Sequence, residues 1–287
     1  MPPCRPKRLL AVAWLGLLLA GCANLAPLRE TEAVGALVPA TMDLDVAPTA
    51  PQWYLPAGKA SALLVFQHGF TRACGHLRGS SRQLMAAGLM VLCVDAPMAG
   101  GNPALAAALA RQLATARTAP DGRALPDRII VAGHSAGAAF AAALGAALVE
   151  IAPERLAGAL LFDPVATERF EAHLRAVSAA GRRPVLAAMA PPHRCNAMSS
   201  ALPALRGIRS EALAAQRDGF VGVRLAAGAT HADIEGEDSD VLAELACGRP
   251  QAAPIAQVRA LAVAWALDLA LGRRPRLDEI GAAQPID

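Results

Sequence analysis

Apolar residues along the chain follow two alternating patterns. Short continuous apolar runs rich in Val, Ile and Leu are typical of strands buried on both faces of a parallel sheet. Segments in which apolar residues recur at helical spacing separate these runs. We expect strands over residues 52–56, 62–67, 89–94, 156–162, 184–189 and 219–225, and a further strand that starts at residue 129.

Helices are expected near residues 80–87, 102–116, 136–149, 167–179 and 254–271, with a less regular stretch over 190–218. Asn102 and Pro103 supply an N-cap and a first-turn proline for the second of these helices. The alternation of strands and helices predicts one α/β domain built on a doubly wound, mostly parallel sheet. Nothing in the pattern indicates a second folded domain.

The N-terminal residues have the pattern of a targeting segment. Basic residues precede an apolar run over 9–20, which is shorter than the roughly 20 residues that a membrane-spanning helix needs. Residues 19–22, Leu-Ala-Gly-Cys, resemble the lipobox of bacterial lipoproteins. The resemblance implies cleavage before Cys22, lipidation of Cys22 and a lipid anchor in the bacterial cell envelope. Ala23 favours the outer membrane, on its periplasmic or exterior side. The alternative is an ordinary secretory signal that has a cysteine at this place by chance.

The composition of the chain argues against several classes of function. Apolar residues make up 54% of the chain but aromatic residues only 3%, so a substrate pocket should be lined by aliphatic side chains. The net charge is +3 and no long basic run is present, which argues against a nucleic-acid partner. The sequence has neither a C-x-x-C pair nor histidines paired on one helix face. We therefore expect no metal and no other cofactor.

Residues 133–137 read Gly-His-Ser-Ala-Gly, between the strand that starts at residue 129 and an Ala-rich helix. The pattern G-x-S-x-G between a strand and a helix is typical of a nucleophile elbow. The glycines allow a sharp turn that lifts the hydroxyl of Ser135 clear of the sheet. We therefore take Ser135 as the candidate nucleophile; the alternative is a Gly-rich turn without chemistry.

A serine hydroxyl becomes a good nucleophile only beside a base that is itself oriented by an acid. His231 follows the last strand before the C-terminal helix and is the candidate base, with His193, one strand earlier, as the alternative. Asp163 ends the strand after the elbow helix and lies between Ser135 and His231 in the sequence. We take Asp163 as the candidate acid, unless it only caps the next helix.

Three other carboxylates are weaker candidates for the acid. The loop after residues 184–189, where the acid is most often found, contains none. Asp95 precedes the serine, and Asp233 is too near His231 in sequence to orient its ring. Asp218 begins a strand and should lie at the opposite edge of the sheet.

Acyl transfer also needs donors for an oxyanion, which are commonly two backbone N–H groups. One is expected from Ala136, directly after the nucleophile. The other is expected from Phe70, because the sequence His68-Gly69-Phe70 ends an earlier strand. The alternative for this second motif is a simple turn after a strand.

Together these motifs resemble the α/β-hydrolase superfamily, and most of all its chlorophyllase-like and dienelactone-hydrolase-like serine carboxylesterase branches. In the chlorophyllase-like branch the strand after the elbow helix ends in Asp-Pro-Val, as at residues 163–165 here, and that Asp is the acid of the triad. The resemblance covers about residues 50–272. It implies a triad of Ser135, Asp163 and His231, but no particular substrate.

Five cysteines follow the predicted cleavage site. Cys195 and Cys247 each follow a late strand on the expected active-site side, and we predict a disulfide between them that braces the loop carrying His231. Cys93 lies in a strand and is interpreted as a small buried apolar residue.

We therefore expect a lipid-anchored serine hydrolase that cleaves small-molecule carboxylic esters through a covalent acyl-enzyme. We divide the chain into a lipoprotein signal peptide over 1–21, a tether over 22–50, a catalytic α/β-hydrolase domain over 51–273 and a polar tail over 274–287. Two alternatives stay open: a non-catalytic envelope lipoprotein that uses the fold as a binding module, and a serine peptidase or thioesterase. No feature of the sequence indicates an oligomeric state.

Overall fold

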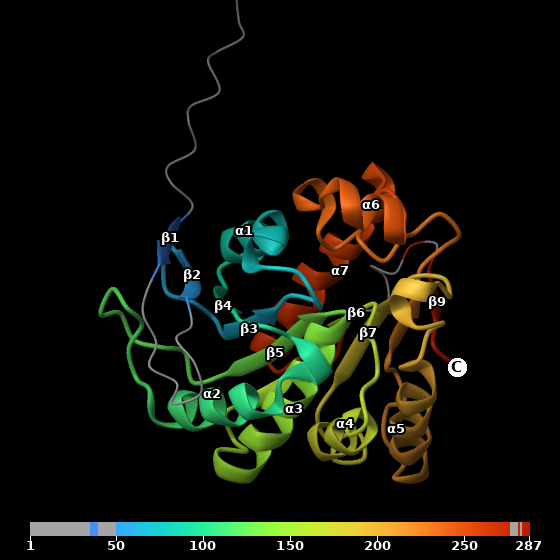
Figure 1. The fold of residues 1–287 in the computed structure, drawn as a ribbon. Helices are drawn as coiled ribbons and strands as arrows, with labels where there is room; N and C mark the ends of the chain where they lie inside the picture. The colour runs from blue at the N-terminus through green and yellow to red at the C-terminus, as the bar shows by residue number, and fades with distance from the viewer. Residues whose placement is uncertain (1–34, 40–49, 276–280, 282) are drawn as a thin grey trace, which may run out of the picture. The chain divides into compact units, whose positions relative to one another are not determined.

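A nine-stranded sheet is the framework of the described chain (Figure 1). The computed structural model describes residues 35–39, 50–275, 281 and 283–287, all within the second of two compact units, Val34–Asp287. The strands are β1 (Gly35–Pro39), β2 (Ala50–Pro56), β3 (Leu63–Gln67), β4 (Met90–Asp95), β5 (Ile129–His134), β6 (Leu156–Phe162), β7 (Val185–Met189), β8 (Gly222–Arg224) and β9 (Gln284–Pro285).

The strands lie in the order β1-β2-β4-β3-β5-β6-β7-β8-β9. Strands β3 to β8 run parallel to one another, whereas β1, β2 and β9 pair antiparallel with their neighbours at the two edges. The doubly wound, mostly parallel sheet predicted from the sequence is therefore confirmed.

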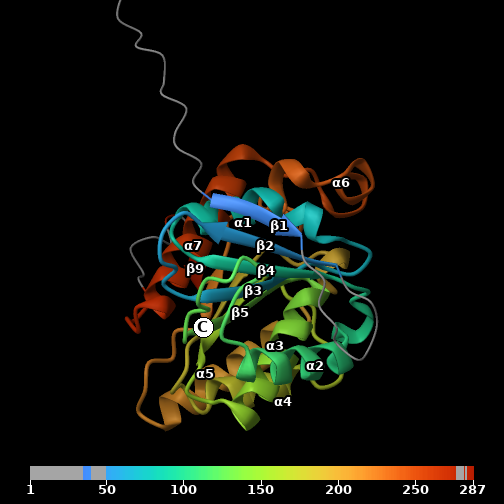
Figure 2. The same ribbon diagram turned by 90° about the vertical axis from the view of Figure 1, so that its left-hand side faces the viewer.

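Helices cover both faces of this sheet (Figures 1 and 2). One face carries α2 (Pro103–Thr115), α3 (Ala136–Ile151), α4 (Phe170–Ser178) and α5 (Leu202–Ala214). The other face carries α1 (Arg78–Ala86) and α7 (Ala252–Ala270). The short helix α6 (Val241–Cys247) lies beyond the carboxyl ends of the strands, where it contacts the 3₁₀ turn η3 (Arg194–Asn196).

The apolar runs of the parallel strands supply side chains to both faces at once. In β3, Leu63 and Val65 pack in the core beneath α2 and α3, while Leu64 and Phe66 pack beneath α1 and α7. All four side chains are buried. Because successive side chains of a strand point to opposite faces, a continuous apolar run is what a sheet covered on both sides requires.

Two helices differ from the expectation. The prediction of a less regular stretch over 190–218 is wrong for α5, a regular helix whose Leu205 and Ile208 are buried against the core. Helix α6 was not among the expected helices; its Val241, Leu242 and Leu245 are exposed in the structure, so it has no inward-facing apolar stripe.

Both ends of the described unit add edge strands. β1 lies within the stretch that we expected to be a tether, and β9 lies within the expected polar tail. Ile286, next to β9, is buried and its N–H donates to the carbonyl of Gly222. The tail therefore closes the sheet beside β8.

Helix α7 is long and apolar enough, by length and composition, to cross a membrane, and it is the only such helix among the described residues. Half of its most apolar window is buried within the protein, and Trp265 in its centre is fully buried against the sheet. These contacts make α7 a core helix of the α/β unit.

Candidate active site

Ser135 lies in a sharp turn between β5 and α3. Its backbone has φ 55° and ψ −122°, which is strained for a residue with a side chain. A Cβ at Gly133 would overlap the carbonyl of Gly137, and a Cβ at Gly137 would overlap the carbonyls that end β3. The two glycines are therefore what allows strand and helix to approach so closely.

The surroundings of Ser135 leave its hydroxyl available. The residue is 8% exposed, and among the described residues its Oγ forms no hydrogen bond. A Cβ at Gly69 would lie 3.0 Å from the Cβ of Ser135, so the loop after β3 passes directly beside the candidate nucleophile. The loop can approach this closely because residue 69 has no side chain.

Asp163 and His231 lie close together at the carboxyl ends of the parallel strands, on the same side of the sheet as Ser135. The Nδ1 of His231 lies 2.6 Å from the Oδ2 of Asp163, and both residues are buried. A carboxylate can only accept here, so Nδ1 of His231 carries the hydrogen and Nε2 is the ring nitrogen left to act as a base.

Backbone hydrogen bonds hold these loops around Ser135. The N–H of Ser135 donates to the carbonyl of Phe162 at 3.0 Å, and its carbonyl accepts from the N–H of Val165 at 3.2 Å. The Asp163 loop is thereby fixed to the elbow on both sides. Asp163 itself has φ 42°, in the left-handed region that Asp tolerates better than most residues.

Asn196 is a site residue that sequence reasoning did not identify. It is fully buried, and its Nδ2 donates to both carboxylate oxygens of Asp163, at 3.1 and 3.2 Å. Its Oδ1 accepts from the N–H groups of His193 and Ser199, which fixes the direction of the amide. An Asn in a loop has no distinctive pattern, so only its position beside the candidate acid Asp163 indicates this contact.

A charged layer supports His231 from behind. The ring of His134 packs against that of His231, with 4.6 Å between centroids, and its Nε2 donates to the carbonyl of His231 at 2.8 Å. The Nδ1 of His134 lies 3.4 Å from the carboxylate of Glu235. Arg72 donates to both oxygens of Glu235, at 2.9 and 2.6 Å. These contacts give His134 a structural part in supporting the loop of His231.

At each of His231 and Glu235, burial and nearby charges shift the pKa in opposite directions. Burial lowers the pKa of His231, and the hydrogen bond to Asp163 opposes that shift without cancelling it. Burial alone would raise the pKa of Glu235, but His134 and Arg72 outweigh burial and lower this pKa to about 2. At neutral pH, His231 is therefore in the unprotonated form that a base requires, and Glu235 is ionised.

The two expected oxyanion donors also lie at the carboxyl ends of the parallel strands. Ala136 is the first residue of α3, where an N–H has no partner within the helix. Phe70 lies in the turn after β3, and within the described residues its N–H has no hydrogen-bond partner. Its side chain is 61% exposed.

The alternative residues have other partners. The Nδ1 of His193 accepts from the N–H of Cys195, so this histidine caps η3. Asp233 accepts from the N–H and hydroxyl of Thr230 at 2.7 and 2.8 Å and thus shapes the loop that carries His231. Asp218, which begins the segment before β8, lies at the opposite edge of the sheet, as expected.

The last alternative acid, Asp95, accepts a 2.6 Å hydrogen bond from the N–H of Cys74. With His68 and Cys74 it forms the one group of potential metal ligands found in the described part of the chain. The sulfur of Cys74 is bonded to Cys93, however, so it is not a free thiolate, and the group does not fit a metal.

Two disulfides brace the loops of the site. Cys195 is joined to Cys247, which connects the loop that holds Asn196 to helix α6. Cys74 is joined to Cys93, which connects β4 to the segment after the Phe70 turn. Cys93 is buried in β4, as interpreted, but it is also bonded to Cys74, a pairing that no local pattern around a strand cysteine indicates.

No protein-family model matches the chain, and neither does any curated protein sequence. Solved structures do match it. Brefeldin A esterase, described as a bacterial homologue of human hormone-sensitive lipase, aligns at a TM-score of 0.58 and 16% identity over 86% of this chain and 80% of its own. A hyperthermophilic esterase from Pyrobaculum calidifontis aligns at 0.56 and 16% identity over 83% and 86%. Dienelactone hydrolase from Anabaena variabilis aligns at 0.55 and 16% identity over 82% and 98%.

These alignments cover most of each chain. The protein has the α/β-hydrolase fold. In this fold, the elbow of Ser135, the end of β6 at Asp163 and the loop of His231 all lie at the carboxyl edge of the parallel strands, which is where ligands of open α/β sheets bind. Cys22, the predicted signal peptide and most of the predicted tether lie outside the described residues.

Proposed function

We propose that the protein is a serine hydrolase that cleaves carboxylic esters through a covalent acyl-enzyme. The observation that carries this proposal is the 2.6 Å hydrogen bond from Nδ1 of His231 to Asp163, beside the strained elbow of Ser135. An acid, a base and an unpartnered serine hydroxyl at one sheet edge are the arrangement that acyl transfer needs. The fold shared with several esterases supports the same reaction class.

The reaction proceeds in two halves. In the first, Oγ of Ser135 attacks the ester carbonyl while Nε2 of His231 accepts the hydroxyl proton. The N–H groups of Phe70 and Ala136 stabilise the oxyanion, and the proton passes to the departing alcohol. In the second half, His231 takes a proton from water, the resulting hydroxide attacks the acyl-enzyme, and the carboxylic acid leaves as Ser135 regains its proton.

Exposed apolar side chains of the loop that passes beside Ser135, and of the helix bound to that loop, favour esters with an aliphatic group. Phe70, Val241 and Leu242 are 61%, 69% and 78% exposed. Their segments are joined, because Arg72 forms a 2.7 Å hydrogen bond with Asp240 at the start of α6. We expect activity on p-nitrophenyl esters to rise as the acyl chain lengthens from acetate.

Labelling with a fluorophosphonate probe tests the mechanism. The wild-type chain should be labelled, whereas Ser135→Ala and His231→Ala should not. Ser199→Ala is the matched control, because Ser199 is also 8% exposed and its labelling should equal that of wild type. Labelling that persists in Ser135→Ala, or its absence from a folded wild-type chain, would overturn the proposal.

We also propose that the mature chain begins at Cys22 and is held in the outer membrane by lipid on that residue. The short apolar run before Cys22 supports this location, and so do the two disulfides, since disulfides persist mainly in oxidising compartments. Bacteria fed radioactive palmitate should label the wild-type chain and Cys4→Ser but not Cys22→Ser. Equal labelling of Cys22→Ser would exclude lipidation at this residue, and a label that fractionates with the inner membrane would exclude the outer-membrane location.

A further inference from the structure

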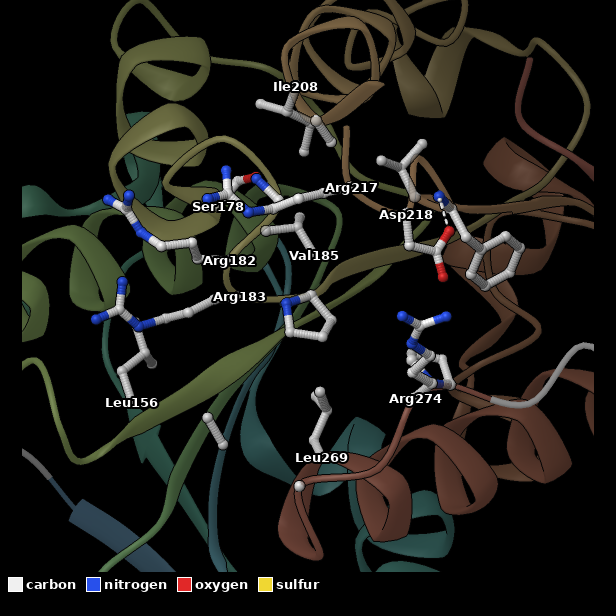
Figure 3. A pocket seen from close by; sticks show the side chains of 18 of the residues that line it. Leu156, Ser178, Arg182, Arg183, Val185, Ile208, Arg217, Asp218, Leu269 and Arg274 are labelled. Carbon is white, nitrogen blue, oxygen red and sulfur yellow. Dashed lines mark hydrogen bonds between the residues drawn. The ribbon is translucent and has the colours of Figure 1, made fainter. Parts of the chain in front are cut away.

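A cavity opens at the amino ends of the parallel strands, on the opposite side of the sheet from the carboxyl ends where Ser135 lies (Figure 3). Its volume is about 740 Å³, and it is lined by the starts of β6 and β7 and by the segment before β8. A cavity of this size can accept a small organic molecule. The candidate triad contributes nothing to it, since those residues follow the carboxyl ends of the strands.

Positive charge dominates the wall of this cavity. Among the described residues, only two carboxylates, Glu154 and Asp218, line it. Against them stand six guanidinium groups, those of Arg128, Arg182, Arg183, Arg217, Arg273 and Arg274. A cavity that concentrates charge of one sign attracts ligands of the other.

Within the described residues, five of these six arginines form no ion pair with a carboxylate. Hydrogen bonds to backbone carbonyls orient three of them, with Arg128 donating to Leu269 at 2.8 Å, Arg183 to Pro153 at 3.0 Å and Arg217 to Ala180 at 3.0 Å. A carbonyl fixes the direction of a guanidinium but carries no net charge. Within the described residues, Arg273 is the one member of the six that forms an ion pair, with Asp268 at 2.9 Å.

The inner wall of the cavity is apolar. Leu156, Val185, Ile208 and Leu269 are buried side chains that line it. Figure 3 places Arg182 and Arg183 on one side of this apolar part and Arg274 on the other. A ligand that fits has an anionic group at the rim and an apolar part inside.

We propose that this cavity binds an organic phosphate ester, with the phosphate held by the arginines and an aliphatic portion against the inner wall. A phosphate presents several acceptor oxygens, which match the planar fork of a guanidinium better than they match an ammonium. The ligand is either a soluble phosphate compound or the headgroup of a phospholipid. The inference does not depend on the proposed hydrolase activity, because the two sites lie at opposite edges of the sheet.

Calorimetric titration of the full chain with hexyl phosphate tests the site. The charge-reversed variant Arg182→Glu/Arg274→Glu should bind hexyl phosphate at least about tenfold more weakly than wild type. The matched control is Arg82→Glu/Arg111→Glu, which changes the net charge equally on α1 and α2, and its affinity should equal that of wild type. Inorganic phosphate should bind more weakly than hexyl phosphate, because it leaves the apolar wall uncovered.

Two results would overturn the proposal: no binding of hexyl phosphate to the wild-type chain, or equal weakening in the cavity variant and the control. Vesicles of phosphatidylglycerol in phosphatidylcholine distinguish the sources of the ligand. Sedimentation with these vesicles that is lost only in the cavity variant identifies a lipid headgroup. Equal sedimentation of all three chains, with hexyl phosphate binding lost in the cavity variant, identifies a soluble phosphate.

Discussion

The Nδ1 of His231 lies 2.6 Å from the Oδ2 of Asp163, although 68 positions separate the two residues in the sequence. The carboxyl ends of β6 and β8 bring them together, and Asn196 from the intervening loop donates to both oxygens of the same carboxylate. The direction of the imidazole is thus set by a carboxylate that is itself held in place.

Replacing Asp163 with Asn should abolish most activity without unfolding the protein. The amide would present a donor or a weaker acceptor to His231 and favour the wrong ring tautomer, which typically costs about 10⁴ in kcat. Asn tolerates a φ of 42° as well as Asp does. Steady-state hydrolysis of p-nitrophenyl butyrate, with circular dichroism as the check on folding, measures both effects. A folded variant that keeps near wild-type kcat would exclude Asp163 as the acid.

Truncating Asn196 to Ala should lower kcat by about 10²-fold, because an acid that can rotate no longer fixes the base within the tolerance that catalysis requires. The variant also leaves the N–H groups of His193 and Ser199 without their acceptor, so some loss of stability is expected. Comparing kcat with the urea midpoint separates the two effects. Unchanged kcat in a destabilised variant would assign Asn196 a purely structural part.

Activity should persist to a pH below the ordinary histidine value of 6.5. Burial lowers the pKa of His231, so the unprotonated base remains in excess until the pH falls through that lowered value. The acid limb of kcat/KM for a neutral ester should therefore have its midpoint below 6.5. A midpoint above 6.5 would mean that the charge of Asp163 outweighs burial at His231.

Glu235 should make stability depend on pH in the acid range. Its pKa is about 2 in the folded protein against an ordinary value of 4.5, so its stabilising effect is complete above pH 4.5 and is lost as the pH falls towards 2. Urea unfolding of wild type and Glu235→Gln should differ most near pH 7, and the difference should narrow on acidification below 4.5. A difference that stays constant down to pH 3 would contradict this linkage.

Gly133→Ala should prevent folding of the elbow, because the added Cβ overlaps the carbonyl of Gly137. We expect a loss of more than about 4 kcal/mol, or an insoluble chain. Gly58→Ala is the control: a Cβ there meets nothing within 4 Å, and the change should be neutral or slightly stabilising. Thermal denaturation compares the two variants. A Gly133→Ala protein as stable as wild type would contradict the close packing of strand and helix.

The sequence predicted those parts of the structure that have a periodic pattern or a fixed motif. The parallel strands are continuous apolar runs, and the turn around Ser135 requires glycines on both sides, so both have a local signature that the residues alone reveal. Asp163 could be singled out as the candidate acid because it ends a strand that lies, in chain order, between the candidate nucleophile and the candidate base.

Features without periodicity could not be predicted. Helix α6 buries none of its residues, so it has no amphipathic signal. Asn196 and Glu235 act through contacts between segments that are distant in sequence, and an isolated Asn or Glu has no local signature. The pairing of Cys74 with Cys93 likewise depends on the position of β4 beside the turn that follows β3.

The backbone at Asp163 has a consequence for how this position can vary in evolution. The proposed reaction requires a carboxylate at position 163, and the φ of 42° requires a residue that tolerates the left-handed region. Glu meets the first requirement and Asn or Gly the second, but Asp alone meets both. Substitutions of Asp163 should therefore be removed by selection as long as the proposed hydrolase activity is selected for. Where selection for the chemistry ends, Asn can replace Asp without loss of the fold, and a binding protein that retains this architecture is one substitution away.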